Sequence, residues 1–431
     1  MNIGKILHSF AKKIWRYNRS LTGDGNRKTL KELKKVCNLL KIKEIKSGKR
    51  VFDWTIPKEW KVNSAFVVNP KGKKILDFSK NNLHLVGYSK FVNKKMKLSE
   101  LNKNLFSLPN QPNAIPYVTS YYNSNWGFCI DHNSRKKLIK GIYHVKIDTK
   151  LFNGSMSYGE IIIRGRLKKE IFLSTYICHP SMANNELSGP TVTIHLAKWL
   201  ISHKNLKYSY RIVFLPETIG SLAYLSKNLK IMKKNIIAGY NITCVGDNRI
   251  YSYLPSRNEN TISDQIALNI LKWNKKKFRR YSWKDRGSDE RQYCSPGIDL
   301  PIASVMRTKY GEYPEYHTSL DNLKNVVTPL GLEGSFKIYQ KIITALENNV
   351  FIKSNILGEP HLSKRKMYST ISSKNKPKKQ INFERLLLNV MSYSDGKTSL
   401  LEISEKCNQP LKNINKIVQY LKKKKLIRII N

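Results

Sequence analysis

The spacing of hydrophobic residues divides the chain into segments with different expected structures. Residues 29–40 repeat apolar side chains at helical spacing, which predicts a helix after the glycine-punctuated turn at residues 19–25. Residues 51–143 alternate short apolar runs with Gly, Pro and Asn, which predicts a small β-rich region with a proline-rich loop at residues 109–116. Strands are expected at residues 65–68, 83–88, 117–122 and 126–130.

From about residue 161 to residue 348, the pattern predicts strands that alternate with helices. Apolar runs at residues 171–177 and 210–215 predict strands, and helical spacing at residues 191–201 predicts a helix between them. Such alternation is typical of an α/β sheet with parallel strands, in which a functional site lies beyond the carboxyl ends of the strands. Two more strands are expected at residues 236–242 and 300–306.

The C-terminal part of the chain shows a third pattern. Residues 361–380 contain no acidic residue and little that could pack, which predicts a basic linker. Beyond it, three short helical segments and a closing strand predict a winged helix-turn-helix module. The expected helices are residues 383–388, 399–406 and 411–421, and the expected strand is residues 426–430.

Composition places the chain among globular proteins. Hydrophobic residues make up 40% of 431 residues, enough to bury a core, which excludes a wholly disordered chain. No run approaches the ~18 apolar residues of a membrane span, and the start lacks the apolar segment of a signal peptide. The six cysteines form no Cys-x-x-Cys pair, which suits reduced thiols and argues against a thiolate zinc site. A cytoplasmic location is therefore expected.

The chain carries a large excess of positive charge. It has 78 Lys and Arg against 30 Asp and Glu, for a formal net charge of +48. One interpretation is contact with nucleic acid or another anionic surface. The other is solvated surface lysine, because the chain is also rich in Asn and Ile, as are proteins from AT-rich genomes. We favour the second, since charge alone indicates solubility and non-specific binding.

Five stretches carry candidate chemistry, and all fall at predicted strand ends or in the loops beyond them. Two histidines, His179 and His317, stand out together with the carboxylates of Glu186, Glu217 and Asp289. Imidazole and carboxylate groups bind zinc, and two histidines with a carboxylate leave a coordination position for water. Metal-bound water can attack an amide carbonyl, and a nearby Glu can carry the proton to the leaving amine.

Each of these residues also has a purely structural interpretation. A histidine at a strand end can simply be hydrogen-bonded, and Glu217 can cap the next helix. Glu186 can stabilise the first turn of a helix, and Asp289 can belong to an Asx turn. Their combination, in this order along the chain, favours a metal-dependent hydrolase.

Longer motifs show a resemblance to a known family. From about residue 15 to residue 348, the chain resembles bacterial aminopeptidase-like proteins that are carried as domains of unknown function and are often associated with surface-polysaccharide biosynthesis. The final 50 residues are similar to the winged helix that often follows in that family. The matching stretches are RSLTGDG (19–25), VFDWTIPKEW (51–60), IPYVTSYY (115–122), WGFCIDH (126–132), STYICHPSMANNELSGP (174–190), PETIGS (216–221), GSDERQYCSPGIDLP (287–301) and YPEYHTSLDNL (313–323).

The resemblance implies a zinc-exopeptidase-like mixed sheet flanked by helices. It implies an aminopeptidase-like α/β domain at residues 1–50 and 144–350, with a β-rich domain inserted at residues 51–143. After the linker, it implies a winged helix-turn-helix at residues 381–431.

The same fold relates the chain more distantly to di-zinc aminopeptidases. Carried over residue by residue, His179 matches their first metal ligand and His317 their last. Asp289 lies in a Ser-Asp stretch that resembles their substrate-side loop. Their acidic ligands fall on Ser181, on Asn185 beside Glu186, on Pro216-Glu217, and near Thr243.

These departures favour one zinc ion over two, because Asn and Thr are poor zinc ligands. The expected ligands are His179 and His317 with a carboxylate from Glu186 or Glu217. We expect Glu186 and Glu217 to divide the ligand and general-base roles, and the sequence leaves their order open.

The expected substrate presents an amide bond, in an N-terminal peptide or an acylated amino sugar. Exopeptidases of this kind commonly use a carboxylate to hold a free amine, and Asp289, Glu290 and Glu315 are the candidates. Solvated loop carboxylates are the alternative for Glu290 and Glu315. The sequence leaves oligomeric state open, and a homo-oligomer is compatible with it.

The competing function is a catalytically weak or inactive metal-binding protein that acts on DNA or protein through its winged helix. The predicted helix at residues 411–421 would present its polar face to a DNA groove. Because the lysine excess extends over the whole chain, specific DNA binding is not favoured. Residues Leu411, Ile414, Val418 and Leu421 are expected to face the core, and Lys412, Asn413, Lys416 and Gln419 to face outward.

Overall fold

The chain divides into two compact units, and the first holds every candidate site residue. The first unit consists of residues 1–263 and 277–337, and the second of residues 264–276 and 338–431. The computed structural model describes residues 2–121, 123–274, 277–367 and 378–430.

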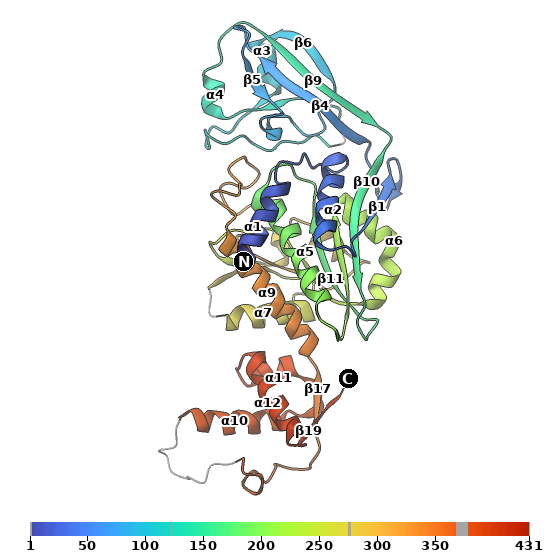
Figure 1. The fold of residues 1–431 in the computed structure, drawn as a ribbon, viewed down its shortest axis with the longest axis vertical. Helices are drawn as coiled ribbons and strands as arrows, with labels where there is room; N and C mark the ends of the chain where they lie inside the picture. The colour runs from blue at the N-terminus through green and yellow to red at the C-terminus, as the bar shows by residue number, and fades with distance from the viewer. Residues whose placement is uncertain (1, 122, 275–276, 368–377, 431) are drawn as a thin grey trace. The chain divides into compact units, whose positions relative to one another are not determined.

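An eight-stranded mixed sheet forms the centre of the first unit (Figure 1). Four neighbouring strands, β12, β11, β13 and β16, run parallel, and antiparallel strands extend the sheet on both sides. β11 and β12 are buried at every position, as expected for strands covered on both faces. The order is β1 (Lys41–Lys46), β10 (Ser155–Ile163), β12 (Ser209–Leu215), β11 (Glu170–Tyr176), β13 (Ile236–Asn241), β16 (Ile302–Met306), β14 (Tyr251–Leu254), β15 (Phe278–Arg280).

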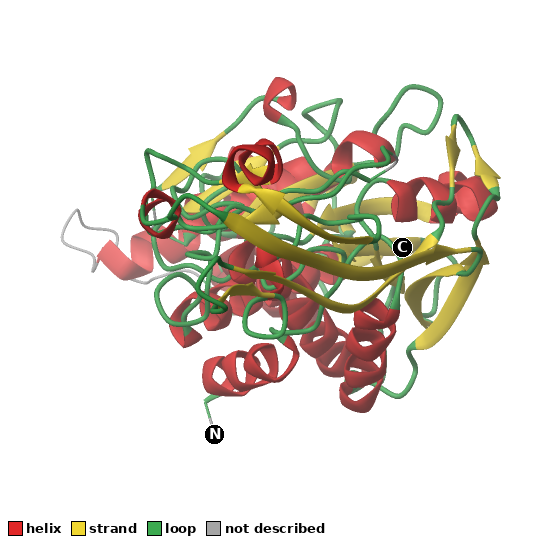
Figure 2. Cartoon of the chain, turned by 90° about the horizontal axis from the view of Figure 1, so that it is seen from above, coloured by secondary structure: helices red, strands yellow, loops and turns green. Residues whose placement is uncertain are grey.

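Helices and strands both make up large parts of the molecule (Figure 2), and the predicted mixed α/β class is confirmed. α1 and α2 pack against α5, which lies on β11. Sequence analysis missed α1, and it placed α2 too late, because the chain turns at Cys37 and enters β1. Outside the β-rich segment, the helices up to residue 349 are α1 (Ile3–Ile14), α2 (Asp24–Val36), α5 (Ser188–Ile201), α6 (Ile219–Asn235), α7 (Ile262–Trp273), α8 (Glu290–Tyr293) and α9 (Pro329–Asn348). Of these, α7 from Asp264 and α9 from Ile338 belong to the second unit.

A separate four-stranded antiparallel sheet lies in the segment expected to be β-rich. Its longest strand, β9, runs to Phe152, so the pairing continues past residue 143, where we expected the insertion to end. The strand order is β5 (Lys74–Asp77), β4 (Glu59–Val68), β9 (Ile142–Phe152), β6 (Val92–Lys97). Shorter elements complete the segment: β2 (Arg50–Val51), β3 (Trp54–Thr55), α3 (Leu98–Leu101), β7 (Leu105–Phe106), β8 (Phe128–Cys129) and α4 (His132–Lys136).

Two expected strands of this segment are wrong. Residues 83–88 contain the end of a 3-10 turn, Asn82–His84, which the Asn81 side chain caps, and then only isolated bridges. Residues 117–121 form no strand either, and Thr119 makes only an isolated bridge to Gly87. Residue 122, the last of this expected strand, lies outside the described residues.

The second unit has the elements of a winged helix-turn-helix. The apolar face predicted for its last helix, α12, is confirmed, since Leu411, Ile414, Val418 and Leu421 are all buried. Part of the predicted linker, residues 368–377, lies outside the described residues, and Leu362 and Met367 are buried just before it. The elements are β17 (Phe351–Ser354), α10 (Lys378–Ser392), β18 (Asp395–Ser399), α11 (Leu400–Lys406), α12 (Leu411–Lys423) and β19 (Ile427–Ile430).

Within the described residues, no helix combines the length and the apolar composition that a membrane crossing requires.

Candidate functional site

The candidate site lies where three parallel strands end. β11 ends at Tyr176, β12 at Leu215 and β13 at Asn241, and β11 pairs with both of the others. Because the carboxyl ends of parallel strands meet at one edge of a sheet, the residues that follow them are brought together. His179 and Glu217 follow the first two strands.

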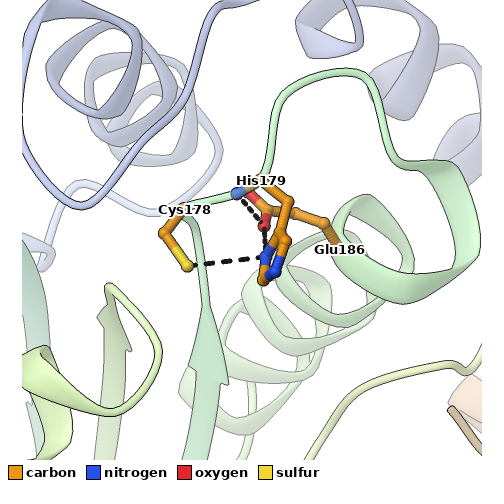
Figure 3. Close-up of side chains that lie close together, drawn as sticks. All are labelled: Cys178, His179 and Glu186. Carbon is orange, nitrogen blue, oxygen red and sulfur yellow. Dashed lines mark hydrogen bonds and ion pairs between the residues drawn. The ribbon is translucent and has the colours of Figure 1, made fainter. Parts of the chain in front are cut away.

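His179 is held in place by Glu186 (Figure 3). Its Nδ1 lies 2.9 Å from Glu186 Oε2, and its backbone N–H donates to the same oxygen. The Cys178 sulfur lies 3.5 Å from Nδ1, and these three residues form a group whose ligand atoms lie within 4.8 Å of one another. A carboxylate on Nδ1 leaves Nε2 as the nitrogen that faces the open side of the site.

Arg19 neutralises the buried Glu186. Its Nε donates to Glu186 Oε1 at 2.8 Å and to the His179 carbonyl oxygen at 3.1 Å. Its terminal nitrogens donate to the carbonyl oxygens of Ile14 and Trp15. Burial lowers the pKa of the Arg19 guanidinium, while the charge of Glu186 raises it. Both oxygens of Glu186 are therefore engaged by protein donors.

A buried aspartate fixes the turn that carries Glu186. The π-helical turn Ala183–Leu187 leads into α5, and the Asp321 carboxylate accepts the N–H groups of Asn184 at 2.7 Å and Asn185 at 3.0 Å. Burial raises the pKa of Asp321 to about 6. This acceptor satisfies backbone donors that the start of a helix leaves without partners.

His317 brings a second imidazole beside the first. The ring centroids of His179 and His317 are 5.3 Å apart. Two imidazoles on one tetrahedral zinc, with Zn–N distances of about 2.0–2.1 Å, have ring centres about 5 Å apart. Burial, and then the charge of His179, lower the pKa of His317 to about 3. A neutral imidazole at this spacing fits a shared metal ion.

The inserted segment supports both imidazoles. The Tyr117 ring packs edge-on against them, with centroids 5.3 Å from His179 and 5.2 Å from His317. The Tyr117 N–H also donates to the His317 carbonyl oxygen at 2.8 Å, and Tyr316 stacks on the His317 ring at 3.9 Å. His317 is therefore positioned by two tyrosines from distant parts of the chain.

Glu217 faces the imidazoles from the end of β12. Its Oε2 lies 3.9 Å from His179 Nε2, too far for a hydrogen bond, and its Oε1 accepts the Ser288 hydroxyl at 2.6 Å. Burial raises the pKa of Glu217, and the charge of His179 opposes that rise. Burial is the largest influence on the pKa of His179 and lowers it, but the hydrogen bond to Glu186 and the charges of Glu186 and Glu217 together raise the pKa overall.

A strained turn presents the Glu217 side chain. Thr218 has φ 64° and ψ −75°, and the Ile219 N–H donates to the Glu217 carbonyl oxygen at 2.8 Å, which defines a γ-turn. This conformation is rare for any residue and unfavourable for a β-branched one. The Glu217 N–H donates to the Cys178 sulfur at 3.2 Å. Burial raises the pKa of the Cys178 thiol well above its usual value, so Cys178 acts here as a neutral acceptor.

Asp289 lies behind this turn and is fully buried. Its Oδ1 accepts the Thr218 N–H at 2.7 Å and the Ser221 hydroxyl at 2.9 Å, and its Oδ2 has no hydrogen-bond partner within the described part of the chain. Burial, followed by the charge of Glu217, raises the pKa of Asp289 to about 8. The structure thus brings Asp289 next to Glu217 but behind the backbone.

The other two carboxylates expected to hold an amine are engaged elsewhere. Glu315 forms a two-point ion pair with Arg249, at 2.7 and 3.0 Å. Burial is the largest influence on the pKa of Glu315 and raises it, but the hydrogen bond to Arg249, a backbone hydrogen bond and the charge of Arg249 together lower the pKa overall. Glu290 is buried and accepts from the backbone N–H groups of Gly287 and Ser288, the Tyr310 hydroxyl and the Asn241 amide.

Two of the positions that match the acidic ligands of di-zinc enzymes, Asn185 and Thr243, belong to a neutral hydrogen-bonded network. Tyr176 donates to Asn185 Oδ1 at 2.8 Å and lies 2.5 Å from Thr243 Oγ1, which donates to the Asn185 carbonyl oxygen at 2.9 Å. Asn185 Nδ2 lies 3.1 Å from His317 Nε2. The donor chemistry therefore fits a metal ion between the imidazoles, and Asn185 and Thr243 add no carboxylate to it.

A cavity of about 590 Å³ opens beside Glu217. Residues of the inserted segment form one wall, and the start of α6 forms another. Its lining residues are Leu21, Trp54, Val86, Phe106, Val118, Thr119, Ser120, Tyr121, Asn123, Asn125, Glu217, Thr218, Ile219 and Arg291.

Sequence analysis missed several residues of the site. Arg19 and Tyr117 belong to motifs that carried the family resemblance, RSLTGDG and IPYVTSYY, but nothing in the spacing assigned them a role. Ser288 stands beside a predicted residue in the GSDER stretch.

Two family models cover nearly the whole chain. The model described as "Domain of unknown function (DUF4910)" matches residues 8–349, and a winged helix-turn-helix model matches residues 350–429. A Clostridium acetobutylicum protein, provisionally named a polysaccharide biosynthesis protein with an aminopeptidase-like domain, is 41% identical over 429 residues, or 99% of this chain and 97% of that protein.

Solved structures show the same relationship. A crystal structure from Clostridium acetobutylicum, provisionally named a peptidase, matches with a TM-score of 0.92 and 40% identity, covering 99% of this chain and 96% of that one. A zinc aminopeptidase from Bacillus subtilis matches with a TM-score of 0.57 and 13% identity, covering 80% of this chain and 94% of that one, which shows a shared fold. The chain thus belongs to the DUF4910 family, with an aminopeptidase-like fold and a C-terminal winged helix-turn-helix.

Proposed function

We propose that the protein is a cytoplasmic hydrolase that cleaves an amide bond with one metal ion, zinc. The observation that carries the proposal is that two imidazoles and one carboxylate lie close together at the carboxyl-terminal edge of the sheet. The His179 and His317 rings lie 5.3 Å apart, and Glu217 Oε2 lies 3.9 Å from His179 Nε2. The names of the Clostridium acetobutylicum relatives support a peptidase-like reaction and a role in polysaccharide biosynthesis.

In this proposal, His179 Nε2 and His317 hold the ion. When bound, the ion would polarise the amide carbonyl and lower the pKa of an attacking water. Glu186 acts as a positioning residue, because its contact with Nδ1 sets the orientation of the His179 ring. Arg19 pairs with that carboxylate at 2.8 Å, and both side chains are buried.

Glu217 is assigned the proton transfer. Its Oε1 is anchored by Ser288, and its Oε2 has no hydrogen-bond donor within the described residues, so Oε2 is free to accept a proton from water. Burial raises the pKa of Glu217 and so moves that pKa toward neutral pH. A pKa closer to the working pH suits a group that takes a proton from water and then gives it to the leaving amine. This assignment gives Glu217 the general-base role, and it gives Glu186 a positioning role in place of the ligand or general-base role expected from the sequence.

The test combines metal analysis with turnover. Glu217→Gln should lower hydrolysis of an amide substrate by about a hundredfold or more and should keep the metal. His179→Ala and His317→Ala should lose both metal and turnover, measured by elemental analysis after dialysis against zinc. Loss of metal in Glu217→Gln would instead make Glu217 a ligand, and chelator-resistant hydrolysis would overturn the metal mechanism.

The winged helix supports a second candidate, a module that contacts nucleic acid or protein. Lys412, Lys416 and Gln419 on α12 are exposed, whereas Asn413 is half-buried and its amide donates to Gln409 at 3.1 Å. The exposed lysines are compatible with phosphate contacts. A duplex of one sequence bound in preference to others would support specific recognition.

A further inference from the structure

We propose that the cavity beside Glu217 binds an anionic, N-acylated amino sugar. This inference rests on the proposed hydrolase function and specifies its substrate class. The acyl amide would lie at Glu217, the negative group at Arg291, and the sugar ring against the aromatic wall. The negative group is a carboxylate or a phosphate.

The first argument is that the cavity offers no carboxylate, other than Glu217, that could hold a free amine among its described lining residues. An N-terminal peptide carries an ammonium group, which a carboxylate must hold. Asp289 is fully buried behind Thr218, and Glu315 is paired with Arg249 and does not line the cavity. Among the described lining residues, Glu217 and Arg291 are the charged ones, and Glu217 faces His179.

The second argument is the position of Arg291. Its Nη2 donates to the Thr218 hydroxyl at 2.9 Å, and Thr218 directly follows Glu217. This contact fixes one corner of an exposed guanidinium at the cavity wall, while the group as a whole has five N–H donors. A planar guanidinium binds carboxylate and phosphate in two-point contacts. The positive charge of Arg291 therefore contacts the residue next to Glu217, the group that we assign to proton transfer.

The third argument is the mixed character of the walls. Trp54, Phe106 and Tyr121 present aromatic rings, and Trp54 is 40% exposed. Hydroxyl and amide side chains from Thr119 and Asn125 lie among them. A sugar ring has an apolar face that packs on aromatic rings and a rim of hydroxyls that needs polar partners. The volume of about 590 Å³ falls in the range of small-molecule sites, about 300–1,000 Å³.

Titration calorimetry on the full-length, zinc-dialysed protein tests the substrate class without requiring turnover. The probes are N-acetylneuraminate, N-acetylglucosamine 1-phosphate, neutral N-acetylglucosamine, and leucinamide as the free-amine ligand. At least one anionic sugar should bind about tenfold or more tightly than the neutral sugar, and leucinamide should bind more weakly than either anion. The tighter of the two anions identifies carboxylate or phosphate as the preferred group. Three results would overturn the proposal: tighter binding of leucinamide than of the sugars, equal affinity for anionic and neutral sugars, or no sugar binding.

Three variants and one matched control locate the contacts of the sugar. Arg291→Gln should weaken anionic sugars about tenfold and leave the neutral sugar unchanged, and Arg291→Lys should keep part of the affinity. Arg286→Gln removes an exposed arginine that does not line the cavity and should change nothing. Trp54→Ala should weaken every sugar. An unchanged preference in Arg291→Gln would contradict the assignment.

This outcome is separable from that of the proposed function. Anionic sugar binding without hydrolysis would leave the cavity assignment intact and refute the hydrolase. Hydrolysis of aminoacyl amides with no sugar binding would support the hydrolase and refute the cavity assignment.

Discussion

Arg19 and Glu186 place two opposite charges in a fully buried position behind His179, with both side chains 0% exposed. A buried ion pair of this kind contributes little net stability over an apolar pair, yet removing one partner leaves the other charge buried and uncompensated. At this site the ion pair fixes a geometry, because Glu186 sets the orientation of the His179 ring. Stability and site geometry therefore depend on the same contact.

Replacing Arg19 tests this dependence. Arg19→Met should lower the free energy of unfolding by about 3–5 kcal/mol, because it leaves Glu186 without its partner. The measurement is urea denaturation followed by circular dichroism. Arg249→Gln is the control, since its ion pair with Glu315 is partly exposed and should contribute less than about 1 kcal/mol. Equal effects of the two substitutions would show that burial does not matter here.

Asp289 predicts a dependence of stability on pH. Its pKa is raised to about 8 by burial, so the folded protein keeps a proton that the unfolded chain, with a pKa of about 3.9, has already lost. Stability should therefore fall as pH rises from about 4 to about 8. Asp289→Asn cannot titrate, so the stability of this variant relative to the native protein should improve across that window. A constant difference between the two proteins would refute the shifted pKa.

Among the elements, the three strands that carry the site share a feature at their ends. β11, β12 and β13 are each followed by a non-glycine residue with positive φ: Ser181 at 48°, Thr218 at 64° and Cys244 at 50°. Such conformations are unfavourable, and they persist where the surrounding structure fixes them. His317 adds a fourth, at 54°. Strain is thus concentrated at the edge of the sheet where the candidate chemistry lies.

Thr218→Gly should relieve part of this strain. We expect the free energy of unfolding to rise by about 1 kcal/mol, while turnover falls because Glu217 is less firmly presented. Thr218→Ser keeps a side chain and a hydroxyl at this position, so it should leave turnover nearly unchanged. Thermal unfolding and amide hydrolysis measured on the same preparations check both effects. A stabilised glycine variant with full turnover would show that the turn does not position Glu217.

The sequence predicted elements best where one apolar pattern covers a whole element. The buried strands β11 and β12 were found as short apolar runs, and the helix α12 was found because its apolar positions repeat at helical spacing. Residues 83–88 looked like a strand, but side-chain capping by Asn81 decides their structure, and periodicity does not detect capping.

For the site, chain order at strand ends was enough to bring His179, Glu217 and His317 into one group. It was not enough to show which carboxylates are free. Glu290 reads as an exposed loop residue, but it accepts from the Asn241 amide and the Tyr310 hydroxyl, which come from distant segments, as well as from nearby backbone N–H groups. Partners of that kind follow from the tertiary fold and leave no local pattern in the sequence.

For the whole molecule, the net charge of +48 makes a prediction about nucleic acid. Binding to duplex DNA should weaken by at least about tenfold between 50 and 200 mM salt, since phosphate contacts release counterions. Two duplexes of unrelated sequence should behave alike in fluorescence anisotropy. Replacing Lys412 and Lys416 together by Ala should have the same modest effect on both duplexes. A preference for one duplex that survives high salt would show sequence recognition by α12.

Two backbone hydrogen bonds connect the inserted segment to the segment that carries the second imidazole. Tyr117 N–H donates to the His317 carbonyl oxygen at 2.8 Å, and Ser319 N–H donates to the Ile115 carbonyl oxygen at 2.9 Å. The backbone on both sides of His317 is therefore tied to the insertion. If the protein is the hydrolase that we propose, a ligand that displaces the insertion should also displace the His317 ring and change the rate of turnover.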